Sequence, residues 1–157
     1  MKCQPNANYN SNDVVMTPLS LSKQIVEHFE PIGKILEPCC GDGSFLKYLP
    51  NADWCEITKG KDFFDCKNKY NWIVTNPPWS KIRLFLQHSM KLADNIVFLM
   101  TVNHLFTRAR IRDVNEAKFG IKEILLLDMP KEFPQSGFQL GAIYLKRSYK
   151  GKTGINK

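Results

Sequence analysis

The sequence predicts an α/β fold in which helices cover both faces of a mostly parallel sheet. Three observations favour this class. Strand-like and helix-like segments alternate along the 157 residues, a length that fits one domain. The candidate strands are nearly continuous apolar runs, which is typical of parallel strands buried on both faces. Clusters of Gly, Pro and polar residues follow several of these strands, at the edge where such sheets bind ligands.

The spacing of apolar residues predicts each element in chain order. A short apolar run at 34–38 ends at a Gly-containing turn, and residues 44–49 have helical spacing. Helix 81–93 places Ile82, Phe85, Leu86, Ser89 and Met90 on one face, and a basic helix is expected at 104–116. The other expected strands are 52–57, 71–75, 95–101, 121–128 and 140–147.

The two ends of the chain carry no such pattern. The first dozen residues are polar, and the tail KGKTGINK is polar and Gly-containing, so both are expected to be loose. We therefore expect a single domain over 1–157 with its core at about 12–147. The N-terminus has no apolar signal region and no apolar run is long enough to cross a bilayer, so we expect a cytoplasmic protein without membrane contact.

Composition narrows the classes of partner and site. There are five cysteines and no C-x-x-C pair, so we expect reduced thiols, with neither a disulfide framework nor a metal site. The formal net charge of +7 favours a polyanionic partner, because Lys and Arg that neutralise phosphates release counterions. That charge is also consistent with simple solubility, so it supports a polyanionic partner only together with a candidate binding site.

The first polar cluster, EPCCGDGSF at 37–45, is a strand end running into a helix. Gly41 and Gly43 allow a sharp turn and a close approach of the backbone to a ligand. Position 46 is Leu rather than a third Gly, and no G-K-S/T follows, so neither a dinucleotide fingerprint nor a P-loop is present. Glu37 suits a ligand with an ammonium or hydroxyl group and repels a pyrophosphate. By itself, G-x-G is equally consistent with an ordinary turn.

The second cluster supplies two further carboxylates. Glu56 ends the next strand, where an acidic residue accepts hydrogen bonds from a ribose diol. Asp62 follows with Phe63 and Phe64; a carboxylate accepts from the exocyclic amine of adenine, and a phenyl ring covers a purine face. A single acidic residue is more often a solvated surface group. Together, these residues indicate a pocket for an adenosine that carries a cationic amino-acid tail.

The third cluster is Asn76-Pro77-Pro78-Trp79, directly after a strand. A residue before proline is kept out of the helical region, so Pro77 holds Asn76 extended. The Asn76 side-chain oxygen and the Pro77 carbonyl then face outward as two converging acceptors, which suit a planar amine with two N–H donors. Trp79 offers a flat face for a base. The alternative is a turn that merely ends the strand.

These motifs together resemble the S-adenosylmethionine-dependent methyltransferases that act on exocyclic amines of nucleobases. EPCCGDGSF resembles their glycine motif, and NPPW resembles their catalytic tetrapeptide. Residues 14–29 are similar to their T-P segment, which covers the methionine end of the cofactor. The resemblance implies a Rossmann-like class I fold with an antiparallel last strand, and S-adenosylmethionine as cofactor. It implies these cofactor-binding residues: Thr17, Pro18, Glu37, Pro38, Cys39, Gly41, Gly43, Glu56, Asp62 and Phe63.

The order of the motifs resembles the gamma arrangement of DNA amino-methyltransferases, which implies an adenine-specific DNA methyltransferase. Related enzymes methylate RNA or a protein glutamine amide. Only ITKGK separates Glu56 from Asp62, where the family has a helix and a strand, so that strand is expected to be missing. We expect no separate target-recognition domain after the catalytic domain. The resemblance therefore implies a virus- or phage-like enzyme with a short target, or one that relies on a partner chain.

The resemblance also implies roles in the reaction. Asn76, Pro77, Pro78 and Trp79 are the implied catalytic residues, acting on a base flipped out of its stack. Phe138 is the implied second stacking aromatic, favoured over Phe133 because Gly137 lets its loop approach, although both could simply pack the sheet end.

Arg108 and Arg112 share a helical face and could contact nucleic-acid phosphates, or could be solvated. Two alternatives to the DNA enzyme remain: an RNA adenine methyltransferase, and a catalytically silent partner subunit that binds cofactor or nucleic acid. The intact motifs argue against the silent subunit.

Overall fold

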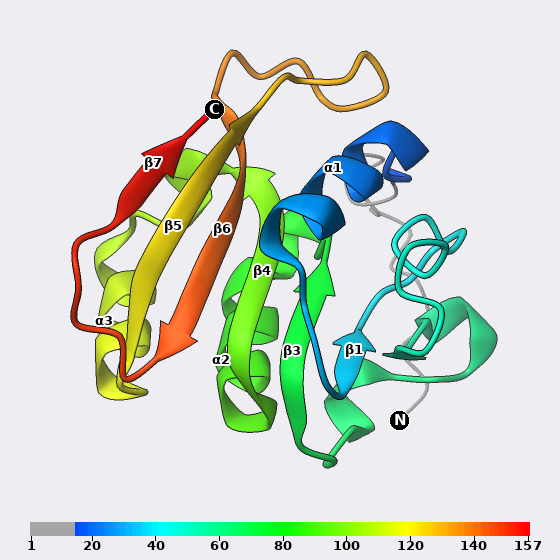
Figure 1. Ribbon diagram of the computed structural model, residues 1–157, viewed down its shortest axis with the longest axis horizontal. Coiled ribbons are helices and arrows are strands. Elements are labelled where there is room, and N and C mark those ends of the chain that lie inside the picture. Colours follow the sequence, from blue (N-terminus) through cyan, green and yellow to red (C-terminus); the bar gives the residue numbers. More distant parts are fainter. Residues whose placement is uncertain (1–14) are drawn as a thin grey trace.

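A computed structural model describes residues 15–157, which form a seven-stranded sheet in the order β2-β1-β3-β4-β6-β5-β7 (Figure 1). Residues 12–14 of the expected core, and Cys3, lie outside the described residues. The other four cysteines are free thiols. The strands are β1 (Ile35–Glu37), β2 (Asp53–Trp54), β3 (Tyr70–Thr75), β4 (Ala93–Thr101), β5 (Phe119–Leu127), β6 (Leu140–Arg147) and β7 (Gly154–Asn156).

The sheet is mostly parallel, as the apolar strands predicted. β1 pairs in parallel with β2 and β3, and β3 pairs in parallel with β4. β6 lies between β4 and β5 and is antiparallel to both, so the expected antiparallel strand is confirmed. It is not the last strand, however, because β7 adds to the outer edge of β5.

Helices cover both faces of the sheet (Figure 1). Helices α2 (Ile82–Leu92) and α3 (Arg108–Glu116) lie on one face, where Phe85, Leu86 and Val114 join a buried cluster with strand residues. Helix α1 (Leu19–Phe29) lies on the other face, where its Leu21 and Ile25 are buried against β3, β4 and β6. Each helix is amphipathic, and burying one apolar stripe per helix creates the two halves of the core.

The segment expected to form a helix at 44–49 forms consecutive hydrogen-bonded turns over 41–48 instead. Phe45 and Leu49 are buried as a helical face would be, and the Leu49 N–H donates to the Phe45 carbonyl at 3.0 Å. Positive φ at Gly41 and Gly43, and Pro50 after Leu49, leave a stretch too short for a continuous helix.

The strand expected at 52–57 is shorter than predicted. It stops at Trp54, because Glu56 caps a 3-10 turn, η2 (Ile57–Lys59), by accepting the Thr58 N–H. A second such turn, η3 (Phe63–Asp65), follows before β3. In the described part of the chain no strand lies between β2 and β3, which confirms the expected missing strand.

The expectation of a loose C-terminal tail is wrong, because residues 154–156 form β7. The backbone groups on the outer edge of β5 pair with it, and the Thr153 hydroxyl donates to the Ile121 carbonyl at 2.8 Å. Ile155 remains 67% exposed, so this strand leaves no apolar pattern in the sequence.

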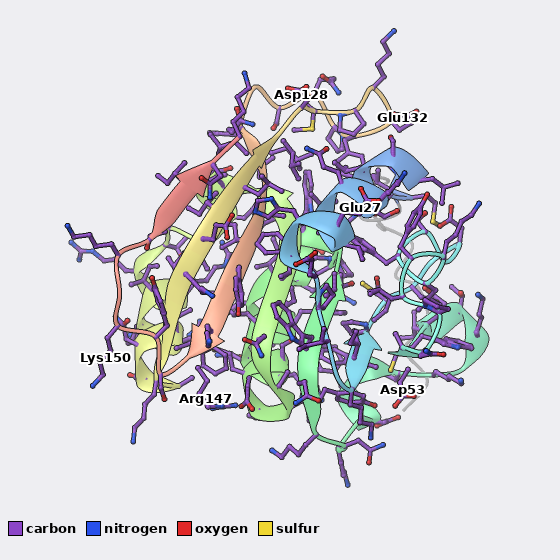
Figure 2. The ribbon with its side chains drawn as sticks, in the orientation of Figure 1. Glu27, Asp53, Asp128, Glu132, Arg147 and Lys150 are labelled. Atoms are coloured by element: carbon purple, nitrogen blue, oxygen red, sulfur yellow. The ribbon has the colours of Figure 1, made fainter. Side chains whose placement is uncertain are left out.

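Residues labelled in Figure 2 mark the two ends of the sheet. The loop after β5 carries Asp128 and Glu132 at the carboxyl end of the strands, and Arg147 at the end of β6 lies at the opposite end (Figure 2). Among the described residues, no helix has the length and apolar character needed to cross a bilayer.

Candidate functional site

A cavity of about 240 Å³ lies at the carboxyl ends of β1, β2 and β3. It brings together residues from all three polar clusters of the sequence, which are far apart along the chain. The predicted site residues that line it are Pro38, Cys39, Gly41, Glu56, Asp62, Phe63, Asn76 and Pro78.

Two hydrogen bonds hold the side-chain amide of Asn76. Its Nδ2 donates to the Val15 carbonyl at 3.3 Å and to Thr17 Oγ1 at 3.2 Å. These contacts use the two N–H donors of the amide, and within residues 15–157 no group donates a hydrogen bond to Oδ1. Pro77 is buried, and Pro78 lines the cavity.

Glu56 lies on the cavity wall and ties two loops together. Its Oε2 accepts the Gly41 N–H at 2.8 Å, and its Oε1 accepts from the backbone and hydroxyl of Thr58 at 3.2 and 3.0 Å. Asp62 is fixed in a similar way, because its Oδ1 accepts the Phe64 N–H at 2.9 Å. Two carboxylates with defined positions therefore face one cavity.

Aromatic rings form the apolar part of the wall. Phe63 is buried and stacks on Phe85 with ring centroids 5.1 Å apart. Phe64 is 42% exposed and also lines the cavity, so it has a ring available to a ligand. The paired phenylalanines after Asp62 were the signal for this wall, although the sequence pointed to Phe63 rather than Phe64.

Glu37 lies behind the cavity wall. It is 1% exposed, and its carboxylate accepts the Cys39 N–H at 3.1 Å and a hydrogen bond from the Thr75 side chain. Burial raises the pKa of Glu37 to about 8. Any contact between Glu37 and a ligand in the cavity would have to pass the Cys39 segment.

Thr17 and Pro18 line an open depression beside the cavity, together with Asp42, Gly43 and Ser44. The Ser44 hydroxyl donates to the Thr17 carbonyl, which joins the start of α1 to the glycine turn. Met16 lines both the depression and the cavity. A Cβ at position 41 would lie 2.9 Å from the sulfur of the flexible Met16 side chain, and the φ of +54° at this position favours glycine.

Trp79 lies beside the cavity, half-buried between the two parts of the core. Its Nε1 donates to the Leu99 carbonyl at 3.3 Å, and its ring meets the edge of Phe133 with centroids 5.9 Å apart. Phe133 is 2% exposed, so it packs the sheet end, whereas Phe138 is 56% exposed. Phe138, the preferred candidate for the second stacking aromatic, therefore has an accessible ring, and its role stays a prediction.

His104 also contacts the Trp79 ring, with centroids 5.6 Å apart. Burial, and to a lesser degree the nearby charge of Arg110, lowers the pKa of His104. Sequence reasoning missed this residue, since a lone histidine after a strand carries no signal.

Arg108 and Arg112 are both exposed on α3, and their contact with phosphates stays a prediction. The helix itself is held in place by Asp113, whose carboxylate accepts from Arg83 at 2.7 and 3.1 Å and from Gln87 at 3.0 Å. The two arginines therefore project from a fixed support.

Several cavity-lining residues were not among the predicted site residues. Lys81 follows the tetrapeptide in the turn η4 (Trp79–Lys81), and its place beside NPPW was the available signal. Within residues 15–157, no three His, Cys, Asp or Glu side chains are arranged to hold a metal ion. The missed residues of the cavity are Val15, Met16, Ile57, Thr58, Phe64, Lys81 and Phe85.

No family model and no curated protein matches the sequence. Solved structures do match. A candidate RNA methyltransferase from Pyrococcus horikoshii has a TM-score of 0.62 at 11% identity, over 88% of each chain. A candidate class I S-adenosylmethionine-dependent methyltransferase from Listeria monocytogenes has a TM-score of 0.63 at 14% identity, over 93% of this chain and 66% of that one.

The M protein of the type I restriction enzyme EcoKI has a TM-score of 0.65 at 15% identity, over 88% of this chain. The present chain spans 45% of that protein. At these identities the likeness concerns the fold. The chain has the Rossmann-like class I methyltransferase fold.

Proposed function

We propose that this protein transfers a methyl group from S-adenosylmethionine to the exocyclic amine of adenine in DNA. The observation that carries the proposal is how the side-chain amide of Asn76 is hydrogen-bonded. Its Nδ2 is engaged by Val15 and Thr17, so its Oδ1 is the atom left to accept from an amine at a cavity that also holds two carboxylates. A strand-ending turn with no function would not need a fixed amide at the wall of a cavity.

The residues of the cavity fit the proposed cofactor. Glu56 supplies acceptors for a ribose diol, Asp62 supplies an acceptor for the adenine amine, and Phe64 offers an exposed ring to the purine face. The depression beside Thr17 and Pro18 shares Met16 with the cavity, and it has room for the amino-acid tail. Carboxylates near the site also favour a cationic ligand over a phosphorylated one.

The chain's own groups would act on the target amine. When bound, S-adenosylmethionine supplies an electrophilic methyl group. Asn76 Oδ1 and, as the proposed second acceptor, the Pro77 carbonyl would accept the two amine hydrogens, which favours a pyramidal nitrogen with an available lone pair. These acceptors also stabilise the positive charge that grows on the nitrogen, so they act in the transition state. One amine proton then leaves to solvent.

The target base would have to leave its stack to reach this hook. Trp79 is the proposed stacking platform and Phe138 the proposed cover on the other face; the exposure of Phe138 leaves its ring available. Arg108 and Arg112 would contact phosphates beside the site, which is consistent with their exposure and with the net charge of +7.

RNA is the second candidate substrate. The archaeal candidate RNA methyltransferase favours it, because the match covers 88% of this chain and 88% of that protein. The EcoKI M protein, of which this chain spans 45%, favours DNA, and a partner chain that supplies target recognition is part of the DNA proposal.

The test is methyl transfer from labelled S-adenosylmethionine to DNA and RNA in parallel, followed by nucleoside analysis. We expect N6-methyladenine in DNA from the parent, and none from Asn76→Ala. That variant should bind the cofactor nearly as well as the parent, because the lost acceptor acts on the amine. Turnover largely kept by Asn76→Ala would contradict the hook mechanism. Methylated RNA alone would select the second candidate, and cofactor binding without any product would select the silent subunit.

A further inference from the structure

A partly buried hydrogen-bond network lies at the wall of the cavity and joins the ends of β1 and β3. It consists of Glu37, Cys39, Thr75 and the backbone of Asn76. We propose that Cys39 and Thr75 are positioning residues, whose side chains hold the Asn76 carbonyl and thereby fix the direction of the amine-accepting hook. This inference rests on the proposed function and names residues that act through Asn76.

The contacts are short and lie within one small region. Cys39 Sγ is 2.9 Å from Thr75 Oγ1, and the Cys39 thiol donates to the Asn76 carbonyl at 3.1 Å. Thr75 is the last residue of β3 and is fully buried, and Cys39 lies two residues after the end of β1. The network therefore links the glycine turn of one strand to the tetrapeptide of the next.

The chemistry of the tetrapeptide explains why such a contact is needed. A peptide plane is usually held by hydrogen bonds on its N–H and its C=O. The peptides that precede Pro77 and Pro78 have no N–H, so their planes can be held only through a carbonyl or through packing. In the first of these peptides the carbonyl belongs to Asn76, and the Cys39 thiol is its donor. Loss of that donor would free the plane to rotate.

The surroundings also keep Cys39 in the state in which it can donate. The thiol has a single proton, which it donates to the Asn76 carbonyl, so its sulfur meets the Thr75 hydroxyl as an acceptor. Burial, with the nearby charge of Glu37, raises the pKa of Cys39 well above its ordinary value. The sulfur therefore stays protonated and suits a hydrogen-bonding role rather than a nucleophilic one.

Simple packing is the competing explanation, and neighbouring residues provide matched controls. Cys40 is the next residue of the glycine turn and is buried, whereas Cys39 is half-buried; the Cys40 thiol is 3.9 Å from the carbonyl of Gly41 and does not line the cavity. Thr101 is 1% exposed at the end of β4, the same position in the next strand. A packing role predicts similar costs for the two cysteines and for the two threonines.

The experiment compares Cys39→Ala, Cys39→Ser, Thr75→Val and Thr75→Ser with the controls Cys40→Ala and Thr101→Val. We expect kcat for methyl transfer to fall about tenfold in Cys39→Ala and in Thr75→Val, the scale of one lost hydrogen bond. The dissociation constant for S-adenosylmethionine should change less than about threefold in Thr75→Val, because Thr75 is buried and does not line the cavity. The serine variants, which keep a hydroxyl donor, should recover most of the lost kcat, and the controls should match the parent.

A second readout does not depend on activity. The S–H stretching band in the infrared spectrum should include a component at lower frequency than a free thiol, and Cys39→Ser should remove it while Cys40→Ala leaves it. Parent-like kcat in Cys39→Ala, no recovery in Cys39→Ser, or a Cys39 band at the free-thiol position would overturn the inference. If the parent methylates neither DNA nor RNA, the proposed function fails, and the infrared band still decides whether the network exists.

Discussion

Glu37 and Glu56 are carboxylates at the ends of neighbouring strands, yet their surroundings differ. Glu56 lies on the cavity wall and accepts three hydrogen bonds at 2.8–3.2 Å. Glu37 is buried behind Cys39, where desolvation disfavours its charged form. Glu56 thus has its carboxylate at the cavity, whereas Glu37 has its carboxyl group inside the protein.

The buried carboxyl of Glu37 gives stability a pH dependence with a definite sign. Its pKa is raised from 4.5 to about 8, so between these values the unfolded chain has released a proton that the folded protein still holds. The free energy of unfolding should therefore fall as pH rises through this window, with a contribution of up to about 1.4 kcal/mol per pH unit.

Glu37→Gln should flatten this dependence, because a glutamine has no proton to release. Urea unfolding at a series of pH values measures it. Glu27→Gln, at an exposed position of α1, is the control and should keep the parent's slope. Equal slopes in the parent and Glu37→Gln would show that Glu37 is ionised at neutral pH in the folded protein.

The Glu56 position makes a separate prediction about the cofactor. S-adenosylmethionine should raise the thermal midpoint of the parent, because a ligand that binds only the folded state stabilises it by mass action. Glu56→Ala should show a much smaller rise at the same ligand concentration, since the proposed ribose acceptor is lost. Equal shifts in variant and parent, measured by differential scanning fluorimetry, would refute the ribose assignment.

At the scale of elements, the tetrapeptide segment is fixed by the contacts of Trp79, and the carboxylate of Asp113 ties α3 to α2. Trp79 is packed by Phe133 and hydrogen-bonded to the Leu99 carbonyl, so it has a structural role besides the proposed stacking. Asp113 anchors α3 to Arg83 on α2, which leaves the outer face of α3 to Arg108 and Arg112. Both elements present side chains from rigid supports.

Substitutions at Trp79 should separate its two roles. Trp79→Phe keeps a ring and loses the Nε1 hydrogen bond, so it should cost about 1 kcal/mol of stability and retain most of the turnover. Trp79→Ala should cost about 2–3 kcal/mol, because it leaves a cavity against Phe133, and it should also lose the stacking platform. Urea unfolding and turnover are measured on the same samples; turnover that tracks stability alone would argue against stacking.

The arginines of α3 make a prediction about salt dependence. The double variant Arg108→Ala with Arg112→Ala should weaken DNA binding and lower the slope of log affinity against log salt by about one for each phosphate that is no longer neutralised. The control removes the same number of positive charges by replacing Lys150 and Lys152, which are exposed residues before β7. Lys150 lies at the opposite end of the sheet from Asp128 (Figure 2). An unchanged slope in the arginine variant would mean that this face is merely solvated.

At the scale of the whole molecule, the site is a consequence of strand order. β1 lies between β2 and β3, so the turns after these three strands meet at one edge of the sheet (Figure 1). The far side of the sheet is completed by β7, which pairs with β5 and whose Asn156 Nδ2 donates to Glu123 at 2.9 Å. The carboxyl ends of β1, β2 and β3 therefore form the cavity, whereas β7 covers the outer edge of β5.

Removal of residues 153–157 should uncover the outer edge of β5. We expect a loss of about 2 kcal/mol in the free energy of unfolding, from several lost hydrogen bonds, and a tendency to associate through the exposed edge. Cofactor binding should persist, because the cavity lies at the other side of the sheet. Urea unfolding and light scattering measure these effects, and an unchanged stability would show that β7 adds little to the fold.

The sequence by itself determined the class of the fold, most of its elements and the main site clusters. Apolar periodicity is a local property, so β6 and α2 follow from it closely, and the Gly and Pro clusters mark strand ends because those residues restrict the backbone locally. Positive φ values and a proline shortened the expected helix at 44–49 to turns, and edge pairing made a strand of the tail.

Only the tertiary structure decided what each site residue faces. Whether Glu37 lines the cavity or lies behind it, whether Phe133 or Phe138 is accessible, and which donor holds Asn76 all depend on contacts between segments that are distant in the chain. Such contacts arise from the packing of three strand ends against α1 and α2, and no pattern within a single segment records them. The roles of individual residues were therefore set by packing, and their presence at the sheet edge by the sequence.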